Sequence, residues 1–194
     1  NPLLLIIVDE SLSMRSRKYE ILDGINQFID VQRKVSTDGS RLVLVKFNNS
    51  VTFLHKGKSL QFLTCIHRLT LGLIILTGTD LSEVEHLRTT DYNPAGRTAF
   101  FDAVQQGISL TDEIKQKDER VVCIIITDGE DTASKQNVSC KLVKKLVKKF
   151  DLKPDWSFTY IGKPPEYWSR KKPVSKVSYE CHTQKQVCQR HKSV

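Results

Sequence analysis

Three oxygen-bearing side chains alternate near the start of the chain: Asp9, Ser11 and Ser13. A six-residue apolar run, Leu3 to Val8, comes directly before them. A short run rich in isoleucine and valine predicts a strand buried on both faces of a parallel sheet. Ligands of open α/β sheets bind beyond the carboxyl ends of strands, and oxygen ligands in a compact loop suit a hard cation such as Mg²⁺. The pattern therefore predicts a cation site, and the simpler alternative is a turn or helix cap.

Two later stretches favour the cation site. Residues 96–103, GRTAFFDA, predict a glycine loop that runs into a helix. Val121 to Ile126 is a second apolar strand, and it ends in Thr127-Asp128-Gly129. With the first stretch, these two motifs resemble a von Willebrand factor A (vWA) domain that carries a metal-ion-dependent adhesion site (MIDAS). The resemblance covers about residues 2–168.

The resemblance implies a set of metal ligands from three separate loops. The implied ligands are Asp9, Ser11, Ser13, Thr98 and Asp128. It also implies Mg²⁺ or Mn²⁺ as the cation, with the two carboxylates bound directly or through water. Because most of these ligands are neutral, the cation stays electrophilic. In the resembled family an Asp or Glu of a protein partner completes the coordination, so we expect a metal-dependent protein-protein interaction module.

Four neighbouring residues bear on this expectation. Leu12 stands where the family often has glycine, and a positive φ there would be strained. Glu10 adds negative charge beside the site and is expected to point away. Glu130 and Asp131 follow Asp128, and a solvated turn is the simplest interpretation of both.

The rest of the chain predicts a Rossmann-like α/β fold. We expect a doubly wound, mainly parallel central sheet with helices on both faces and one antiparallel edge strand, Val51 to His55. The helix expected at 136–150 carries five lysines opposite its apolar face. A sheet-covering helix is favoured there, and a membrane-surface helix is the alternative. Further strands are expected at 41–47 and 156–161, and further helices at 15–33 and 98–117.

The predicted domain organisation is a vWA-like domain over residues 1–168 and a basic tail over residues 169–194. An apolar insertion at about 61–82 interrupts the domain, and a short helix is expected near 81–87. The insertion is either an interaction hairpin or a sequence that was never selected to fold. The net charge is +8, and residues 163–194 carry eight Lys or Arg against two Glu. The body is therefore close to neutral, and the insertion and tail are expected to be the least ordered regions.

Catalysis is not expected, because the chain has no Gly-x-Ser-x-Gly elbow and no glycine-rich dinucleotide fingerprint. A phosphoryl-transfer receiver would need an aspartate after the strand at 41–47, where Asn48 stands. A haloacid-type phosphatase would need a second aspartate where Ser11 stands. A metal-free vWA-like scaffold that presents binding surfaces remains an open alternative.

Cysteine usage favours a reducing, cytoplasmic compartment, because the five cysteines are odd in number and form no Cys-x-x-Cys pair. Cys123, inside an apolar strand, is expected to be an inert core thiol. No apolar run is long enough for a transmembrane segment. We expect no nucleic-acid partner, although the basic tail leaves weak binding open.

Overall fold

The computed structural model describes residues 1–35, 39–54 and 79–162. In this part of the chain β1 lies at the centre of a mixed sheet of order β3-β2-β1-β5-β6. The pairings β1–β2, β1–β5 and β5–β6 are parallel, whereas β3 and β4 pair antiparallel with β2. The fold is therefore Rossmann-like, as predicted, with the two motif-bearing strands adjacent. The strands are β1 (Pro2–Asp9), β2 (Arg41–Phe47), β3 (Val51–Leu54), β4 (Thr79–Asp80), β5 (Arg120–Ile126) and β6 (Trp156–Ile161).

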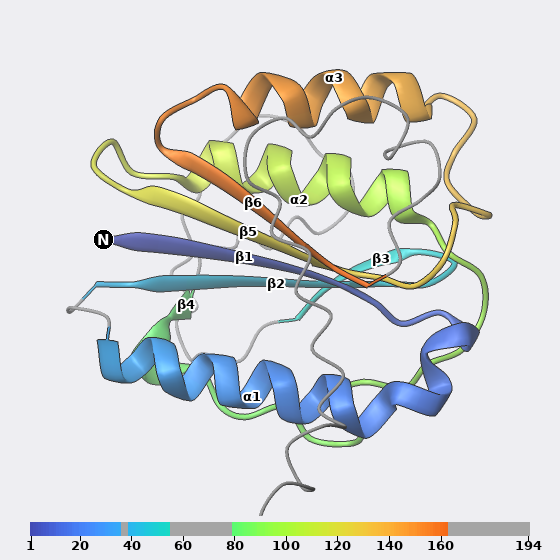
Figure 1. Ribbon diagram of the computed structural model, residues 1–194, viewed down its shortest axis with the longest axis horizontal. Coiled ribbons are helices and arrows are strands. Elements are labelled where there is room, and N and C mark those ends of the chain that lie inside the picture. The colour runs from blue at the N-terminus through green and yellow to red at the C-terminus, as the bar shows by residue number, and fades with distance from the viewer. Residues whose placement is uncertain (36–38, 55–78, 163–194) are drawn as a thin grey trace, which may run out of the picture.

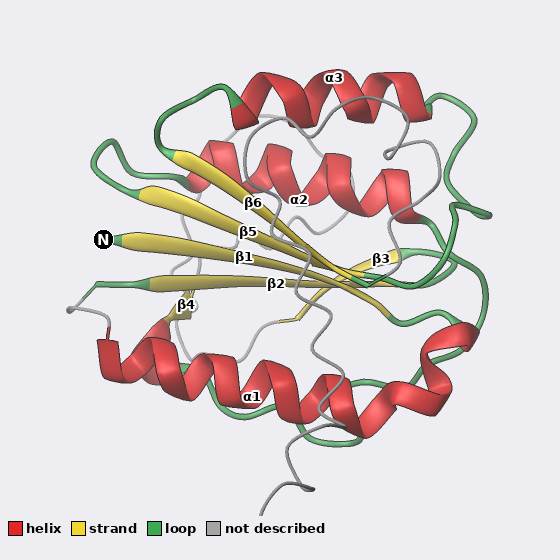
Figure 2. Ribbon diagram, in the orientation of Figure 1, coloured by secondary structure: helices red, strands yellow, loops and turns green. Residues whose placement is uncertain are grey.

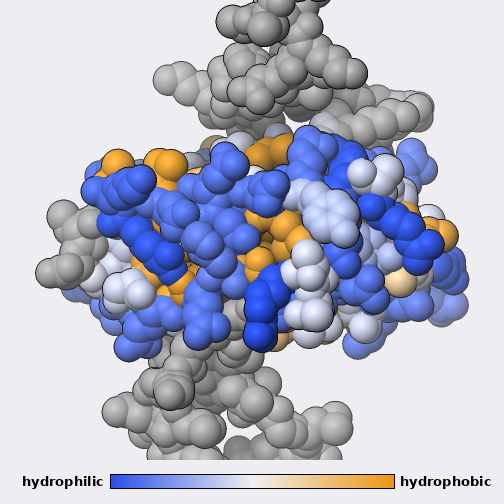
Figure 3. Space-filling view, turned by 90° about the horizontal axis from the view of Figure 1, so that it is seen from below, coloured by the Kyte–Doolittle hydropathy of each residue, from blue (hydrophilic) through white to orange (hydrophobic). Residues whose placement is uncertain are grey.

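Among the described residues, three α-helices cover the sheet on both faces (Figure 1). α1 (Lys18–Val35) lies on one face, and α2 (Phe100–Ile114) and α3 (Cys140–Asp151) lie on the other. A 3-10 helix, η1 (Leu12–Arg17), leads from the end of β1 into α1, and a shorter one, η2 (Leu81–Glu83), follows β4. Figure 3 views the α1 side, where hydrophilic residues cover much of the surface and hydrophobic ones show between them.

The unbroken apolar run of β1 is explained by its central position. Successive side chains of a strand point to opposite faces, so a strand covered on both faces must be apolar at every position. Leu3, Leu5 and Ile7 join the core beneath α2 and α3, and Leu4, Ile6 and Val8 join the core beneath α1.

The helix boundaries differ from the predictions by a few residues. α3 begins at Cys140, because the Ser139 hydroxyl caps it by accepting a hydrogen bond from Leu142 N at 3.3 Å. α2 begins at Phe100, and a side chain of a later loop, Asp131, accepts a hydrogen bond from Phe101 N in its first turn. The helix expected at 81–87 is only the 3-10 turn η2, since the chain is extended at Val84.

Two predictions concern residues beyond this part of the chain. Most of the apolar insertion (residues 61–78) and the tail (169–194) lie outside the described residues. In the described ranges, no helix is both long and apolar enough to cross a bilayer.

Candidate metal centre

Asp9 is the last residue of β1, and its side chain is completely buried. Ser11 N donates to Asp9 Oδ1 at 2.7 Å, and the Thr127 hydroxyl donates to Asp9 Oδ2 at 2.6 Å. Burial raises the pKa of Asp9 above its usual range, although these hydrogen bonds act in the opposite direction. Asp9 is thus a rigidly held carboxylate whose charge no neighbouring cation balances in the described structure.

The two serines connect the loop after β1 to the loop after β5. Ser11 Oγ and Ser13 Oγ lie 3.0 Å apart, and the Ser13 hydroxyl donates to Asp128 Oδ1 at 2.8 Å. β1 and β5 are adjacent and parallel, so their carboxyl ends present both loops at one edge of the sheet (Figure 2). Four of the five predicted site residues are therefore joined by one chain of hydrogen bonds.

Thr98, the fifth residue, reaches the same place from the loop before α2. A Cβ placed on Gly129 would lie 3.6 Å from Thr98 Oγ1 and 3.8 Å from both Asp9 Oδ2 and Ser13 Oγ. Oxygens from the end of β1, from the loop that follows it and from the loop before α2 thus lie close to one point, which has no side chain because residue 129 is glycine. The structure brings all five predicted residues together.

Two neighbours of Asp9 hold the first loop without entering the site. The Tyr92 hydroxyl donates to Asp9 O at 2.6 Å, and burial, followed by the charges of Asp9 and Glu10, raises the pKa of this phenol. The Glu10 side chain points away, as expected, and accepts a hydrogen bond from Lys46 Nζ at 2.9 Å. Leu12 begins η1, and its side chain is 53% exposed beside Ser13.

The loop after β5 positions Thr98 by wrapping over the start of α2. Thr98 N donates to Thr132 Oγ1 at 3.0 Å, and Thr98 O accepts from Thr132 N at 2.8 Å. Asp131 Oδ1 accepts from Phe101 N at 3.2 Å. Asp131 is therefore a half-buried helix cap, and the simple interpretation of this residue as a solvated turn is wrong.

The donor set suits a hard divalent cation. It contains two carboxylates and three hydroxyls and has no nitrogen or sulfur donor, which favours Mg²⁺ or Mn²⁺ over softer metals. Over the described residues, no group of three or more His, Cys, Asp or Glu comes together, so this hydroxyl-rich cluster differs from a carboxylate cage. The chemistry of this donor set therefore fits such a cation.

The sequence analysis missed Thr127 and Tyr92 as partners of Asp9. Thr127 is completely buried and directly precedes Asp128, so its position at the end of β5 was a usable signal. Tyr92 comes from an irregular segment 83 residues from Asp9, and no local pattern indicated it.

Comparisons with known proteins show a vWA-like fold. No protein-family model matches the chain, and no curated protein matches it. A von Willebrand factor type A protein from Catenulispora acidiphila is similar over 84% of this chain and 33% of its own, at 14% identity and a TM-score of 0.53. Manganese-loaded TRAP from Plasmodium vivax is similar over 84% of this chain and 57% of its own, at 19% identity and a TM-score of 0.53.

A third similar structure is proximal thread matrix protein 1 from the mussel byssus, with 16% identity and a TM-score of 0.52 over 84% of this chain and 38% of that one. At these identities the likeness concerns the fold alone. The chain spans only about a third of the length of the first of these structures.

Proposed function

We propose that this vWA-like domain is a non-catalytic interaction module that binds Mg²⁺ or Mn²⁺ and, through the cation, an Asp or Glu of a partner protein. The proposed ligands are Asp9, Ser11, Ser13, Thr98 and Asp128. One observation carries the proposal: oxygens of Asp9 and Ser13, at the end of β1 and in the loop after it, and of Thr98, in the loop before α2, lie within 3.8 Å of the Cβ position of Gly129.

The residues of the site divide the task of holding a cation. Asp9 and Asp128 would supply its negative charge, and the hydroxyls of Ser11, Ser13 and Thr98 would supply neutral oxygens. Thr127 and the backbone N–H of Ser11 orient the two oxygens of Asp9. A bound cation supplies the positive charge that attracts a partner carboxylate, because two carboxylates and neutral hydroxyls leave its charge incompletely shielded.

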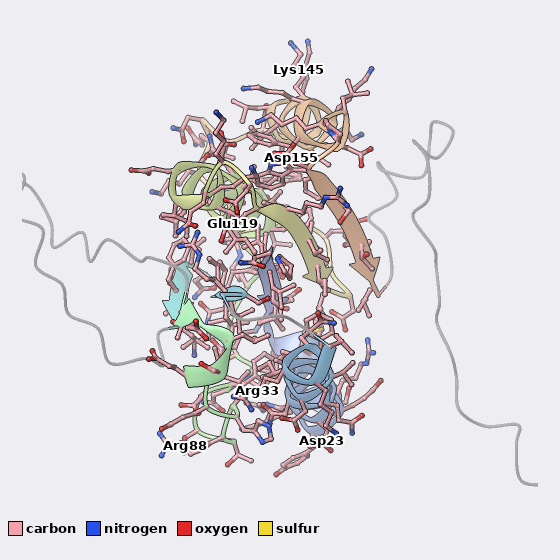
Figure 4. The ribbon with its side chains drawn as sticks, turned by 90° about the vertical axis from the view of Figure 1, so that its left-hand side faces the viewer. Asp23, Arg33, Arg88, Glu119, Lys145 and Asp155 are labelled. Carbon is pink, nitrogen blue, oxygen red and sulfur yellow. The ribbon has the colours of Figure 1, made fainter. Side chains whose placement is uncertain are left out.

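Calorimetric titration of the purified chain with MgCl₂ and MnCl₂ tests the metal. We expect binding by the wild type and none by Asp9→Ala or Asp128→Ala. Thr98→Ala should bind more weakly, since water can replace one hydroxyl. Asp23→Ala, at an exposed carboxylate of α1, is the matched control and should bind like the wild type (Figure 4).

The metal-free scaffold makes a different prediction for partner binding. If a partner is retained equally well in EDTA and in Mg²⁺, the cation has no part in the interaction. If retention requires the cation, replacing the partner's acidic residue by alanine should remove most of the affinity.

A further inference from the structure

α3 is an amphipathic helix whose apolar side is already used inside the domain. Val143 is completely buried and Phe150 is 2% exposed, in the core between α3 and the sheet. The rings of Phe150 and Trp156 lie 4.5 Å apart between their centroids. The helix therefore covers the sheet, as expected, and its apolar side is not available to a lipid bilayer.

The outer side of α3 carries a stripe of lysines that ends in an exposed leucine. At about 100° per residue, Lys141, Lys145, Lys148 and Leu152 lie within about 60° of one another on the side opposite the core. All three lysines are exposed, and Leu152 is 69% exposed. Figure 4 shows Lys145 at the outer edge of the molecule, directed away from the sheet. We call these four residues the α3 stripe.

The charge of α3 is strongly positive. Residues 132–150 include six lysines and no Asp or Glu, and the one acidic residue of the helix is its last, Asp151. Like charges four residues apart, as in Lys141 and Lys145, destabilise a helix. The helix dipole favours Lys148 in the last turn but disfavours Lys141 in the first. Helix stability therefore does not explain why lysines predominate here. Surface solvation does not explain it either, because a mixture of positive and negative side chains would be equally well solvated.

Two carboxylates near α3, Asp112 and Asp155, are engaged by other lysines. Lys153 binds Asp112 at 3.2 Å, and Lys115 binds Asp155 at 2.8 Å. Within the described part of the chain, the three lysines of the α3 stripe form no ion pair. Their ammonium groups therefore remain available to an external anion.

The side-chain types favour a lipid surface over a nucleic acid. α3 has no arginine, the residue best suited to phosphates of nucleic acids, and its aromatic residue Phe150 is buried. Lysines beside an exposed leucine match an anionic membrane interface, where ammonium groups meet headgroups and an apolar side chain enters the boundary below them. Leu142, 39% exposed, flanks the stripe near the other end of the helix.

We propose that the α3 stripe docks the domain reversibly on a bilayer rich in anionic lipids. The lysines contact the headgroups, and Leu152 lies at the boundary of the acyl region. The candidate metal centre lies at the edge of the sheet rather than on the α3 layer, so docking is independent of the cation (Figure 1).

Vesicle co-sedimentation with the full chain tests this proposal. The probes are phosphatidylcholine vesicles with and without phosphatidylserine, in EDTA. We expect binding only to the anionic vesicles. Raising the salt from about 0.1 M to about 1 M shortens the Debye length from about 10 Å to about 3 Å and should abolish binding.

Charge-matched variants separate the α3 stripe from net charge. Lys141→Gln/Lys145→Gln/Lys148→Gln should lower the partition coefficient about 100-fold, since each lysine near an anionic surface contributes about fivefold. Lys18→Gln/Lys34→Gln/Lys117→Gln makes the same charge change elsewhere and should lower it far less. Leu152→Gln should weaken binding at constant charge. Circular dichroism checks that every variant is folded.

Three outcomes would overturn the proposal. The first is equal binding to neutral and anionic vesicles, and the second is an equal loss in both triple variants. The third is binding of a DNA duplex, lost in the α3 triple variant, without any binding of vesicles.

Discussion

Asp9 and Glu119 are buried carboxylates at opposite ends of the sheet, and their surroundings differ. Glu119, 3% exposed, accepts hydrogen bonds from Arg41 Nε at 2.8 Å and Arg41 Nη2 at 2.6 Å, and also one from Gln116 N at 2.7 Å. Asp9, 0% exposed, accepts from the neutral groups of Ser11 and Thr127. Glu119 thus has a guanidinium to balance its charge, whereas Asp9 has none among the described residues.

The pKa directions of the two groups reflect this difference. Burial acts to raise the pKa of both carboxyls, but at Glu119 the hydrogen bonds from Arg41 and Gln116 N and the charges of Arg41 and Lys115 together outweigh burial, and the pKa is lowered. At Asp9 burial dominates and the pKa is raised. Glu119 stabilises the fold as an ion, whereas the charge of Asp9 costs stability until a positive charge is supplied. This contrast supports a structural role for Glu119 and a binding role for Asp9.

The largest expected effect is that of Glu119→Ala, which leaves the mostly buried Arg41 guanidinium without its carboxylate. The free energy of unfolding should fall by about 3–5 kcal/mol, measured by urea denaturation. Glu113→Ala, at an exposed glutamate of α2, is the control and should change little. If Glu119→Ala lowers the free energy of unfolding no more than the control does, Glu119 has no structural role that distinguishes it from Asp9.

Cation binding should stabilise the end of the sheet that holds Asp9. At a Mg²⁺ concentration 100-fold above its dissociation constant, the wild type should gain about 2.7 kcal/mol. Asp9→Asn should gain nothing from Mg²⁺, and in EDTA it should be no less stable than the wild type because no charge is buried. Thermal unfolding of the wild type and of Asp9→Asn, with and without Mg²⁺, measures these stabilities. An equal stabilisation of the two proteins by Mg²⁺ would disprove the role of Asp9 in binding the cation.

Thr127→Val tests whether neutral donors hold the Asp9 carboxylate. The substitution keeps the shape of the side chain but removes the hydroxyl that donates to Asp9 Oδ2. A hydrogen bond to a charged group contributes about 1.5–3 kcal/mol, and urea denaturation should show a loss of that size. Thr159→Val on β6 is the control. Equal effects of the two substitutions would mean that the Thr127 hydroxyl does not support Asp9.

The pH dependence of stability should differ in sign at the two carboxylates. The lowered pKa of Glu119 adds stability above the unfolded pKa of about 4.3, and this stability is lost as pH falls through the folded pKa. The advantage of the wild type over Glu119→Gln should therefore shrink on acidification. The raised pKa of Asp9 costs stability at neutral pH, and Asp9→Asn should lose its relative advantage as pH falls. The urea midpoints of the wild type, Glu119→Gln and Asp9→Asn, measured in EDTA between pH 7 and pH 3, give both stability differences.

The smallest effect is expected where an ion pair is exposed. Asp112 and Lys153 are 3.2 Å apart, with side chains 42% and 36% exposed. Solvent screens such a pair, so Asp112→Ala should cost about 0–1 kcal/mol in urea denaturation. A loss as large as that of Glu119→Ala would show that burial does not determine how much the Asp112–Lys153 and Glu119–Arg41 ion pairs contribute to the free energy of unfolding.

Much of the fold was predictable because its strands are either fully apolar or strictly patterned. Arg41–Phe47 and Trp156–Ile161 were placed with the observed bounds, and the run at the start of the chain indicated a central strand. Helix ends were less predictable, since caps depend on distant partners. The first turn of α2 is capped by Asp131, which accepts from Phe101 N, 30 residues away in the chain.

The sequence by itself determined the chemistry of the candidate site: oxygen side chains after one apolar strand, Asp128 after a second, and Thr98 before a helix. Only the tertiary structure decided that these groups meet, because Ser13 and Asp128 are 115 residues apart and become neighbours through the parallel pairing of β1 with β5. Burial of Asp9 and its bond to Thr127 also depend on that pairing. Local sequence specifies which atoms are present, whereas long-range packing sets their distances and their electrostatic cost.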